Sequence, residues 1–334
     1  MKINLIVLAL FGLSLFSCKE RPKINEAKPA ENTELEQLSL LIKGDSNNAA
    51  LYNQRANYYL SRNDVALALN DINKALQKNS KDQALFLTLA EIYLKMGQPD
   101  GCNSALQKAV EIDPENSVPY FRLAELNLLL EDYTTAMMYA DRSLNMHQLN
   151  PDAHFVKGLI YLAKNDTTNA IRNFQFSLDQ RELFLEPLIQ LGKIYTIQRN
   201  NLAALYLEKA IRQFPEAYDA RYQLALYLQD NERVEEALIH YDTLLQLLPE
   251  NKYVLFNIGY LQLVYLNNFE KAIQFFDEVL LNDPNYVDAL YNKGRALEEL
   301  GQFMNSREIY NEVLRRESNH HLAIEALNRL DLRR

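Results

Sequence analysis

Residues 83–116 read QALFLTLAEIYLKMGQPDGCNSALQKAVEIDPEN. The first half of this stretch carries apolar residues at helical spacing, and so does its second half. A short turn that contains Gly97 separates the two segments. Pro114 follows the second segment, at a place where proline stops a helix and resets the direction of the chain. The stretch therefore predicts two helices joined by a tight turn.

The same pattern recurs eight times along the chain. A column of small residues marks the first segment of each unit: Ala56, Ala90, Ala124, Gly158, Gly192, Ala225, Gly259 and Gly294. A second column marks the second segment: Ala68, Cys102, Ala136, Ala170, Ala203, Ala237, Ala272 and Ser306. Each second-column residue precedes the next first-column residue by 22 positions, so every length change falls in the turn within a unit, where a loop tolerates it. Small residues in register indicate that the helix backbones lie close together. The recurrence of the helix pair predicts an all-α array.

The period, the helix pair and the residue pattern resemble the tetratricopeptide repeat. Within residues 83–116 the signature places of that family are occupied by Phe86, Leu89, Ala90, Tyr93, Leu106, Ala109 and Pro114. The resemblance implies an α-solenoid, a right-handed superhelix of eight helix-turn-helix repeats whose first helices line the concave face. The expected repeats are 49–82, 83–116, 117–150, 151–184, 185–217, 218–251, 252–286 and 287–320.

A lone helix is expected at each end of the array, because terminal repeats need a capping surface. At the N-terminal end this is residues 33–48. At the C-terminal end it is residues 321–334, which we expect to cover the eighth repeat through Ile324 and Leu327.

The N-terminus is typical of a secretory signal. Residues 1–17 carry one positive charge and an apolar run, and residues 15–18, LFSC, resemble the lipobox of bacterial lipoproteins. In that family Cys18 would receive a diacylglyceryl group and the signal would be cut before it; an ordinary signal peptide that contains a cysteine is the alternative. Residues 18–32, with almost nothing to bury, predict a lipidated cysteine and a flexible tether. By resemblance, Lys19 points to an outer-membrane lipoprotein, on the periplasmic face or at the cell surface.

The composition excludes some classes of partner and some kinds of chemistry. The 334 residues carry 44 acidic against 35 basic side chains, a net charge of −9, and such a surface repels phosphate backbones. We therefore expect no nucleic acid as a partner, and membrane contact through a lipid anchor only. The five histidines and two cysteines show no metal-ligand or catalytic spacing, and no glycine-rich phosphate loop is present. Neither enzymatic activity, nor a cofactor, nor a metal is expected.

The functional prediction depends on the first helices. The resemblance places twelve of their residues in the groove: Leu87, Phe121, Leu128, Phe155, Leu159, Leu162, Ile189, Tyr222, Leu226, Phe256, Tyr260 and Tyr291. Stacked repeats would turn them into an apolar stripe, which normally marks a binding surface for an extended peptide or an amphipathic helix. Glu91 and Glu125 in the groove argue against the family's clamp for a C-terminal carboxylate, which needs cationic side chains.

The expected function is a lipid-anchored, non-catalytic scaffold or adaptor that binds polypeptides and supports envelope protein assembly or secretion. Two alternatives remain open at this point. The protein could be a surface receptor for a ligand or a glycan, or the stripe could be structural and pack against the next repeat.

Overall fold

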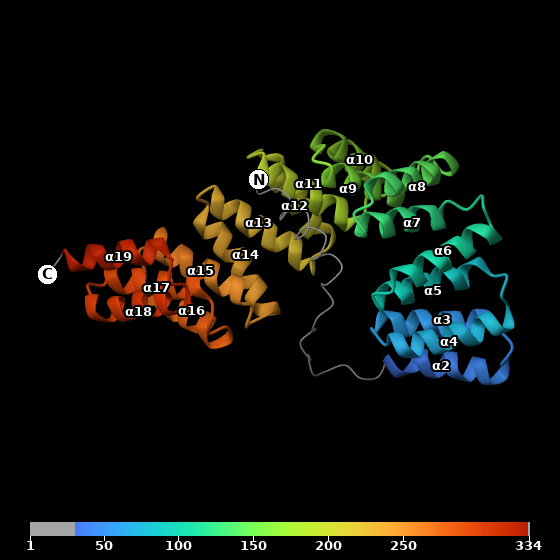
Figure 1. Cartoon of the computed structure of the whole chain (residues 1–334), viewed down its shortest axis with the longest axis horizontal. Coiled ribbons are helices and arrows are strands. Elements are labelled where there is room, and N and C mark those ends of the chain that lie inside the picture. The colour runs from blue at the N-terminus through green and yellow to red at the C-terminus, as the bar shows by residue number, and fades with distance from the viewer. Residues whose placement is uncertain (1–30, 333–334) are drawn as a thin grey trace. The chain divides into compact units, whose positions relative to one another are not determined.

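The computed structural model describes residues 31–332, which form eighteen helices and no strand (Figure 1). The prediction of an all-α solenoid of helix pairs is therefore confirmed. The expected signal, Cys18 and most of the tether lie in residues 1–30, outside the described residues, as do residues 333–334. None of the helices in residues 31–332 is long and apolar enough to cross a membrane.

Sixteen of the helices in this described range form eight pairs, and two stand alone. The first helices of the pairs are α3 (Ala49–Ser61), α5 (Gln83–Lys95), α7 (Val118–Leu129), α9 (Pro151–Ala163), α11 (Leu185–Ile197), α13 (Tyr218–Asp230), α15 (Lys252–Val264) and α17 (Val287–Glu299). The second helices are α4 (Val65–Lys78), α6 (Pro99–Ile112), α8 (Tyr133–Met146), α10 (Thr167–Gln180), α12 (Leu202–Gln213), α14 (Val234–Leu247), α16 (Phe269–Asn282) and α18 (Phe303–Arg316). The lone helices are α2 (Glu31–Gly44) and α19 (His321–Asp331).

Both small columns lie where the two helices of a pair meet, and all of their residues are buried. A Cβ on Gly158 would lie 2.5 Å from the ring of Phe174, and a Cβ on Gly294 would lie 2.6 Å from the ring of Tyr310. The Ser306 hydroxyl donates a hydrogen bond to the carbonyl of Gly294 at 2.8 Å. Small residues are needed here because the large side chains of the second helix fill the space against the backbone of the first.

Every pair has the same turn between its two helices. One residue in each turn adopts a left-handed backbone, with φ between 51° and 72°: Asn63, Gly97, Glu131, Asn165, Arg199, Glu232, Asn267 and Gly301. Glycine takes this conformation without strain and asparagine takes it more readily than other residues. The turn is therefore set by the geometry of the pair, since glutamate and arginine also adopt it.

The array divides into two compact units between Pro187 and Leu188, in the first turn of α11. Unit 1 comprises the described residues 31–187 and unit 2 comprises residues 188–332. The sequence predicts one unbroken array, and the repeat pattern does continue through both units. A solenoid can divide in this way because each repeat contacts only its neighbours.

The lone helices cover the ends of their units. α2 packs on α3 in unit 1, and α19 packs on α18 in unit 2 (Figure 1). The prediction that Ile324 covers the eighth repeat is wrong, because its side chain is 40% exposed. Ala323, Ala326 and Leu330 are buried there instead, and Leu327 packs against the same core cluster. The covering face thus begins one residue earlier than expected.

Candidate functional site

The twelve residues predicted to form the groove all lie on first helices, on what we term the first-helix face. Three of them are buried: Phe121, Leu128 and Ile189. The other nine are half-buried: Leu87, Phe155, Leu159, Leu162, Tyr222, Leu226, Phe256, Tyr260 and Tyr291. Since all twelve lie within the described residues and none is exposed, each contributes to packing and most also present some surface to solvent. A role in ligand binding stays a prediction.

In unit 1 the row on the first-helix face is anchored by packing from behind. The Phe155 ring centroid lies 5.7 Å from that of Phe174 on α10 and 5.4 Å from that of Phe184 in the next linker. The guanidinium carbon of Arg122 lies 5.1 Å from the ring centroid of Phe121. These contacts hold the rings in place, so that the row is a rigid surface and not a set of loose side chains.

Two carboxylates, Glu91 on α5 and Glu125 on α7, lie one turn beyond this row in unit 1. Glu125 accepts a hydrogen bond from Arg122 Nη1 at 2.9 Å. Burial raises the pKa of Glu125, and the neighbouring guanidinium opposes that shift. Two acidic side chains at these places would repel the carboxylate of a peptide C-terminus.

In unit 2 the row becomes aromatic and centres on Phe256 of α15. Its ring centroid lies 5.8 Å from that of the buried Phe276, 5.3 Å from that of Tyr286 and 6.5 Å from that of Tyr260. Tyr253 is 53% exposed, and its ring lies 6.3 Å from that of Tyr286. We term Tyr253, Phe256, Tyr260 and Tyr286 the α15 aromatic cluster. It runs from the core of its helix pair to the surface.

Polar groups in unit 2 link neighbouring first helices. Lys193 of α11 is only 7% exposed and donates to Asp219 Oδ2 of α13 at 2.8 Å. Asn257 Nδ2 of α15 donates to the Tyr222 hydroxyl of α13 at 3.2 Å. A buried charge needs a partner, and the buried Lys193 ammonium has one in the Asp219 carboxylate on the next first helix. These contacts fix the spacing of the first helices on which the row lies.

Sequence reasoning missed three exposed apolar side chains on the first helices. Leu129 is 41% exposed, Ile197 is 67% exposed and Tyr253 is 53% exposed. Helical spacing could have found them, since Leu129 lies four residues after Glu125 and Tyr253 lies three residues before Phe256. They are more accessible than any of the twelve predicted residues, and they are therefore the better probes of ligand binding.

Profiles of the tetratricopeptide repeat match residues 59–117, 105–138, 195–252, 253–286 and 275–308. Together these segments make up more than half of the chain. The chain belongs to the tetratricopeptide-repeat family. The predicted resemblance to this family is thereby confirmed, and proteins of this family bind protein or peptide partners.

Relatives of this tetratricopeptide-repeat protein match it at low identity. Rat mitochondrial import receptor subunit TOM70 is 21% identical over 315 residues, which are 88% of this chain and 50% of that protein. Human tetratricopeptide repeat protein 13 is 27% identical over 129 residues, 39% of this chain and 15% of that protein. The chain thus spans half or less of the length of these curated relatives.

Two solved structures show the same fold. The APC/C hetero-tetramer Cut9–Hcn1 gives a TM-score of 0.59 at 17% identity, over 91% of this chain and 60% of that one. PilW, a type IV pilus biogenesis factor, gives a TM-score of 0.52 at 19% identity, over 60% of this chain and 94% of that one. At these identities the likeness extends to the fold alone.

The tetratricopeptide-repeat fold is typical of non-catalytic interaction proteins. One human relative, 21% identical over 285 residues, is nevertheless named as the protein O-mannosyl-transferase TMTC3, and this chain covers 31% of it. In the present chain Cys102 is 3% exposed in the second small column, and burial raises the pKa of its thiol to about 11. The thiol is therefore protonated at neutral pH and serves packing.

Proposed function

We propose that this tetratricopeptide-repeat protein is a lipid-anchored adaptor, without catalytic activity, that binds polypeptides on its first-helix face. The proposal depends on one observation. Each first helix from α5 to α17 keeps at least one large apolar side chain half-buried or exposed on this face, and Leu129, Ile197 and Tyr253 are 41%, 67% and 53% exposed. Apolar surface that recurs at one face of a soluble array is unusual unless it contacts a partner.

The chemistry of the face indicates the kind of polypeptide. Unit 1 offers aliphatic and phenyl side chains next to Glu91 and Glu125, which favours apolar residues flanked by a basic one. Unit 2 offers the α15 aromatic cluster beside amide and hydroxyl groups such as those of Asn257 and Tyr222. Aromatic anchors dominate binding energies at protein interfaces. An internal peptide segment or an amphipathic helix fits this mixture better than a free carboxyl end does.

The binding part is tested with the full chain and an array of overlapping peptides from bacterial envelope proteins. The affinity of the tightest peptide is then measured by fluorescence anisotropy for the parent chain, Tyr253→Ser, Leu129→Ser and the control Leu281→Ser. Leu281 is 83% exposed on a second helix, α16, so its loss matches that of Leu129 in chemistry but not in position. Removing an aromatic anchor costs about 2 kcal/mol, a loss of roughly 30-fold in affinity.

A loss in Tyr253→Ser or Leu129→Ser, with Leu281→Ser unchanged, supports the first-helix face as the binding surface. Equal affinity in all four chains, or a loss confined to Leu281→Ser, contradicts it. All three side chains are exposed, so circular dichroism should show the same melting temperature for every variant.

The anchor and the location rest on the N-terminal sequence. The signal-like residues 1–17 and Cys18 support attachment to an outer membrane, where the adaptor would assist envelope protein assembly or secretion. The names of PilW and of the import receptor TOM70 support roles of that general kind for this fold. Cys18→Ser should release the protein from the membrane fraction, because a multiply acylated cysteine holds firmly. A variant that fractionates with membranes like the parent chain would contradict the anchor.

A further inference from the structure

The lone helices at the two ends are the two different halves of a repeat. Glu34 of α2 lies 34 residues before Ala68, so α2 has the register of a second helix. Asn328 of α19 lies 34 residues after Gly294, so α19 has the register of a first helix. Within the described residues 31–332, α2 is thus a second helix with no first helix before it, and α19 is a first helix with no second helix after it.

Among the described residues, the place that a preceding first helix would take beside α2 is open. In the eight complete pairs, three places on the second helix are at most 3% exposed; on α4 they hold Ala68, Ile72 and Ala75. On α2 the same places hold Glu34, which is exposed, Leu38, which is 8% exposed, and Leu41, which is 55% exposed.

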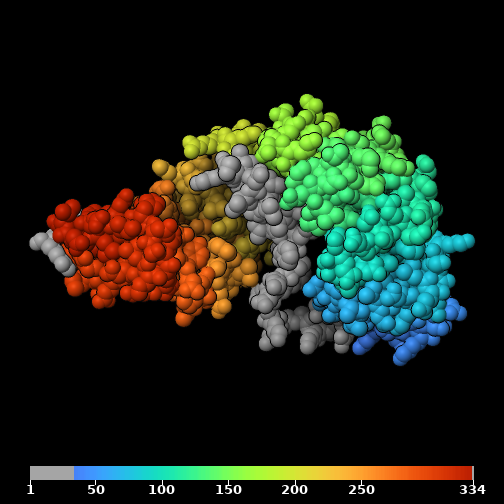
Figure 2. All heavy atoms as spheres, viewed as in Figure 1, coloured from blue at the N-terminus to red at the C-terminus, as the bar shows by residue number. Residues whose placement is uncertain are grey.

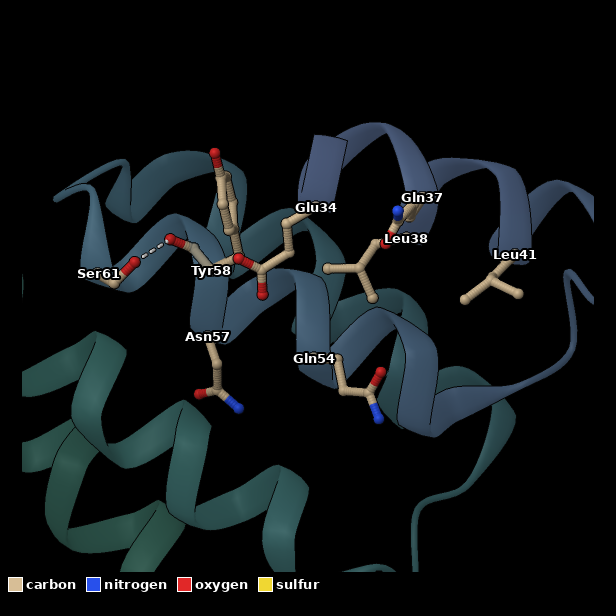
Figure 3. Close-up of a pocket in the computed structure, with 8 residues that line it drawn as sticks. All are labelled: Glu34, Gln37, Leu38, Leu41, Gln54, Asn57, Tyr58 and Ser61. Carbon is tan, nitrogen blue, oxygen red and sulfur yellow. Dashed lines mark hydrogen bonds between the residues drawn. The ribbon is translucent and has the colours of Figure 1, made fainter. Parts of the chain in front are cut away.

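These three α2 side chains line an open pocket of about 470 Å³ between α2 and α3 (Figure 3). Figure 3 shows the side chains of Glu34 and Leu38 pointing toward α3.

The α3 side of the pocket also matches the surface on which a preceding first helix packs. Tyr58 of α3 lines it and is half-buried. The residues at the same place on α5, α7 and α9 are Ile92, Leu126 and Ile160, and these are at most 2% exposed. The pocket is therefore the position that a preceding first helix would fill, lined by the two helices that would contact it.

α19 belongs to the C-terminal part of unit 2, which is red in Figure 2, and it has the matching surface. Ile324 is 40% exposed, whereas Leu290, 34 residues earlier on α17, is 5% exposed. Asn328 is exposed too, at the small-column place. α19 itself is held in a fixed orientation, because Arg329 donates two hydrogen bonds to Glu298, at 2.9 and 2.8 Å.

We propose that α19 of one molecule occupies the pocket beside α2 of a second copy of this chain, and that the two lone helices complete a ninth repeat at a head-to-tail junction. Asn328 then faces Glu34, at the two places that Gly294 and Ser306 hold in the eighth repeat. Because both side chains are larger than glycine and serine, the two helices lie farther apart at this junction than within a pair. The asparagine amide donates to the carboxylate, and Ile324 covers Leu41. This assembly goes beyond the proposed peptide binding, since it uses the ends of the array and not the first-helix face.

The strength and form of the assembly follow from the geometry of its contact. One helix laid on two others buries less than the roughly 1,600 Å² of a standard interface. Association is therefore weak and rises with protein concentration. A contact between two different surfaces leaves one of each free on a dimer, so further copies add to form a chain or a ring.

The test is disulfide trapping between full-length chains. Glu34→Cys and Asn328→Cys are made on separate chains, purified and mixed under mild oxidation. We expect a disulfide-linked dimer from the mixture and none from either variant alone, because only the mixture places the two cysteines opposite each other. The control pairs Asn328→Cys with Glu36→Cys, an exposed place on another side of α2. The single variants also control for Cys18 and Cys102.

Each other outcome overturns the proposal. Absence of the dimer, or equal yields with Glu34→Cys and Glu36→Cys, means that α19 does not enter this pocket. The double variant Glu34→Cys/Asn328→Cys should give a ladder of multimers on a non-reducing gel. If it forms its cross-link only within one chain and runs as a monomer, the occupant is the chain's own helix and not a second copy. Both places are exposed, so the variants should keep the circular dichroism spectrum of the parent chain.

Discussion

The close approach of the two helices in a pair is most sharply tested at Gly158. A Cβ added there would lie 2.5 Å from Cε1 and 2.6 Å from Cδ1 of Phe174, whose side chain is fully buried. The ring or the backbone must therefore move in Gly158→Ala. Overpacking of this kind costs about 1–3 kcal/mol, whereas alanine in place of a helical glycine gains up to about 1 kcal/mol. We expect a net loss of stability of roughly 1 kcal/mol.

The assay is urea unfolding followed by far-UV circular dichroism, with hydrogen exchange in α9 and α10 as the local readout. Phe174→Leu should remove the cost of Gly158→Ala, because the smaller side chain leaves room for the methyl group. The control is Gly44→Ala, where an added Cβ has no neighbour within 4 Å. A gain in stability from Gly158→Ala, or an equal loss with leucine at position 174, would contradict the expected overpacking.

Three further predictions concern a buried ion pair, a histidine and a strained turn. Asp71 is 1% exposed and accepts hydrogen bonds from Arg55 Nε at 2.6 Å and Nη2 at 2.9 Å. Arg55→Ala should therefore lower the free energy of unfolding in urea by about 3 kcal/mol, because it leaves a buried carboxylate unpaired. A negligible loss would contradict this. Burial and the nearby Arg221 lower the pKa of His240 below 6.5, opposed in part by Glu208 and Glu236. The contribution of His240 to stability is therefore full above pH 6.5 and falls as the pH drops toward the folded-state pKa. His240→Gln should make the melting temperature depend less on pH in this range. An unchanged slope of melting temperature against pH would contradict this role of His240. Glu131 holds a φ of 62°, so Glu131→Asn should stabilise unit 1 by about 0.5–1 kcal/mol in the same unfolding assay, and a loss would show that the turn is unstrained.

The repeat could be predicted from the sequence because it depends on local rules that recur. The small columns mark the contact between paired helices, and their spacing survives every length change. The openness of the first-helix face could not be predicted in the same way. Phe121 and Phe155 hold equivalent places on α7 and α9, yet Phe121 is 6% exposed and Phe155 is half-buried. Exposure depends on which side chains the neighbouring helices supply, and that requires the packed structure.

The packing of the helices at the ends of the array could not be predicted from the sequence alone either. The sequence indicated a C-terminal capping helix but placed its covering face one residue too late, at Ile324 instead of Ala323. A short helix with several apolar residues fits more than one register, and only its contacts choose among them. The bidentate pair between Arg329 and Glu298 fixes that register, and its partners lie 31 residues apart in the chain.

Photo-crosslinking tests whether polypeptides bind on the first-helix face. A benzophenone amino acid is placed at Tyr253 or at Leu129 in the full chain, and at Leu281 on α16 as the control, and each variant is irradiated with the peptide selected from the array. We expect a covalent peptide adduct from Tyr253 or Leu129 and none from Leu281. An adduct from Leu281 alone, or equal adducts from all three places, would contradict binding on this face.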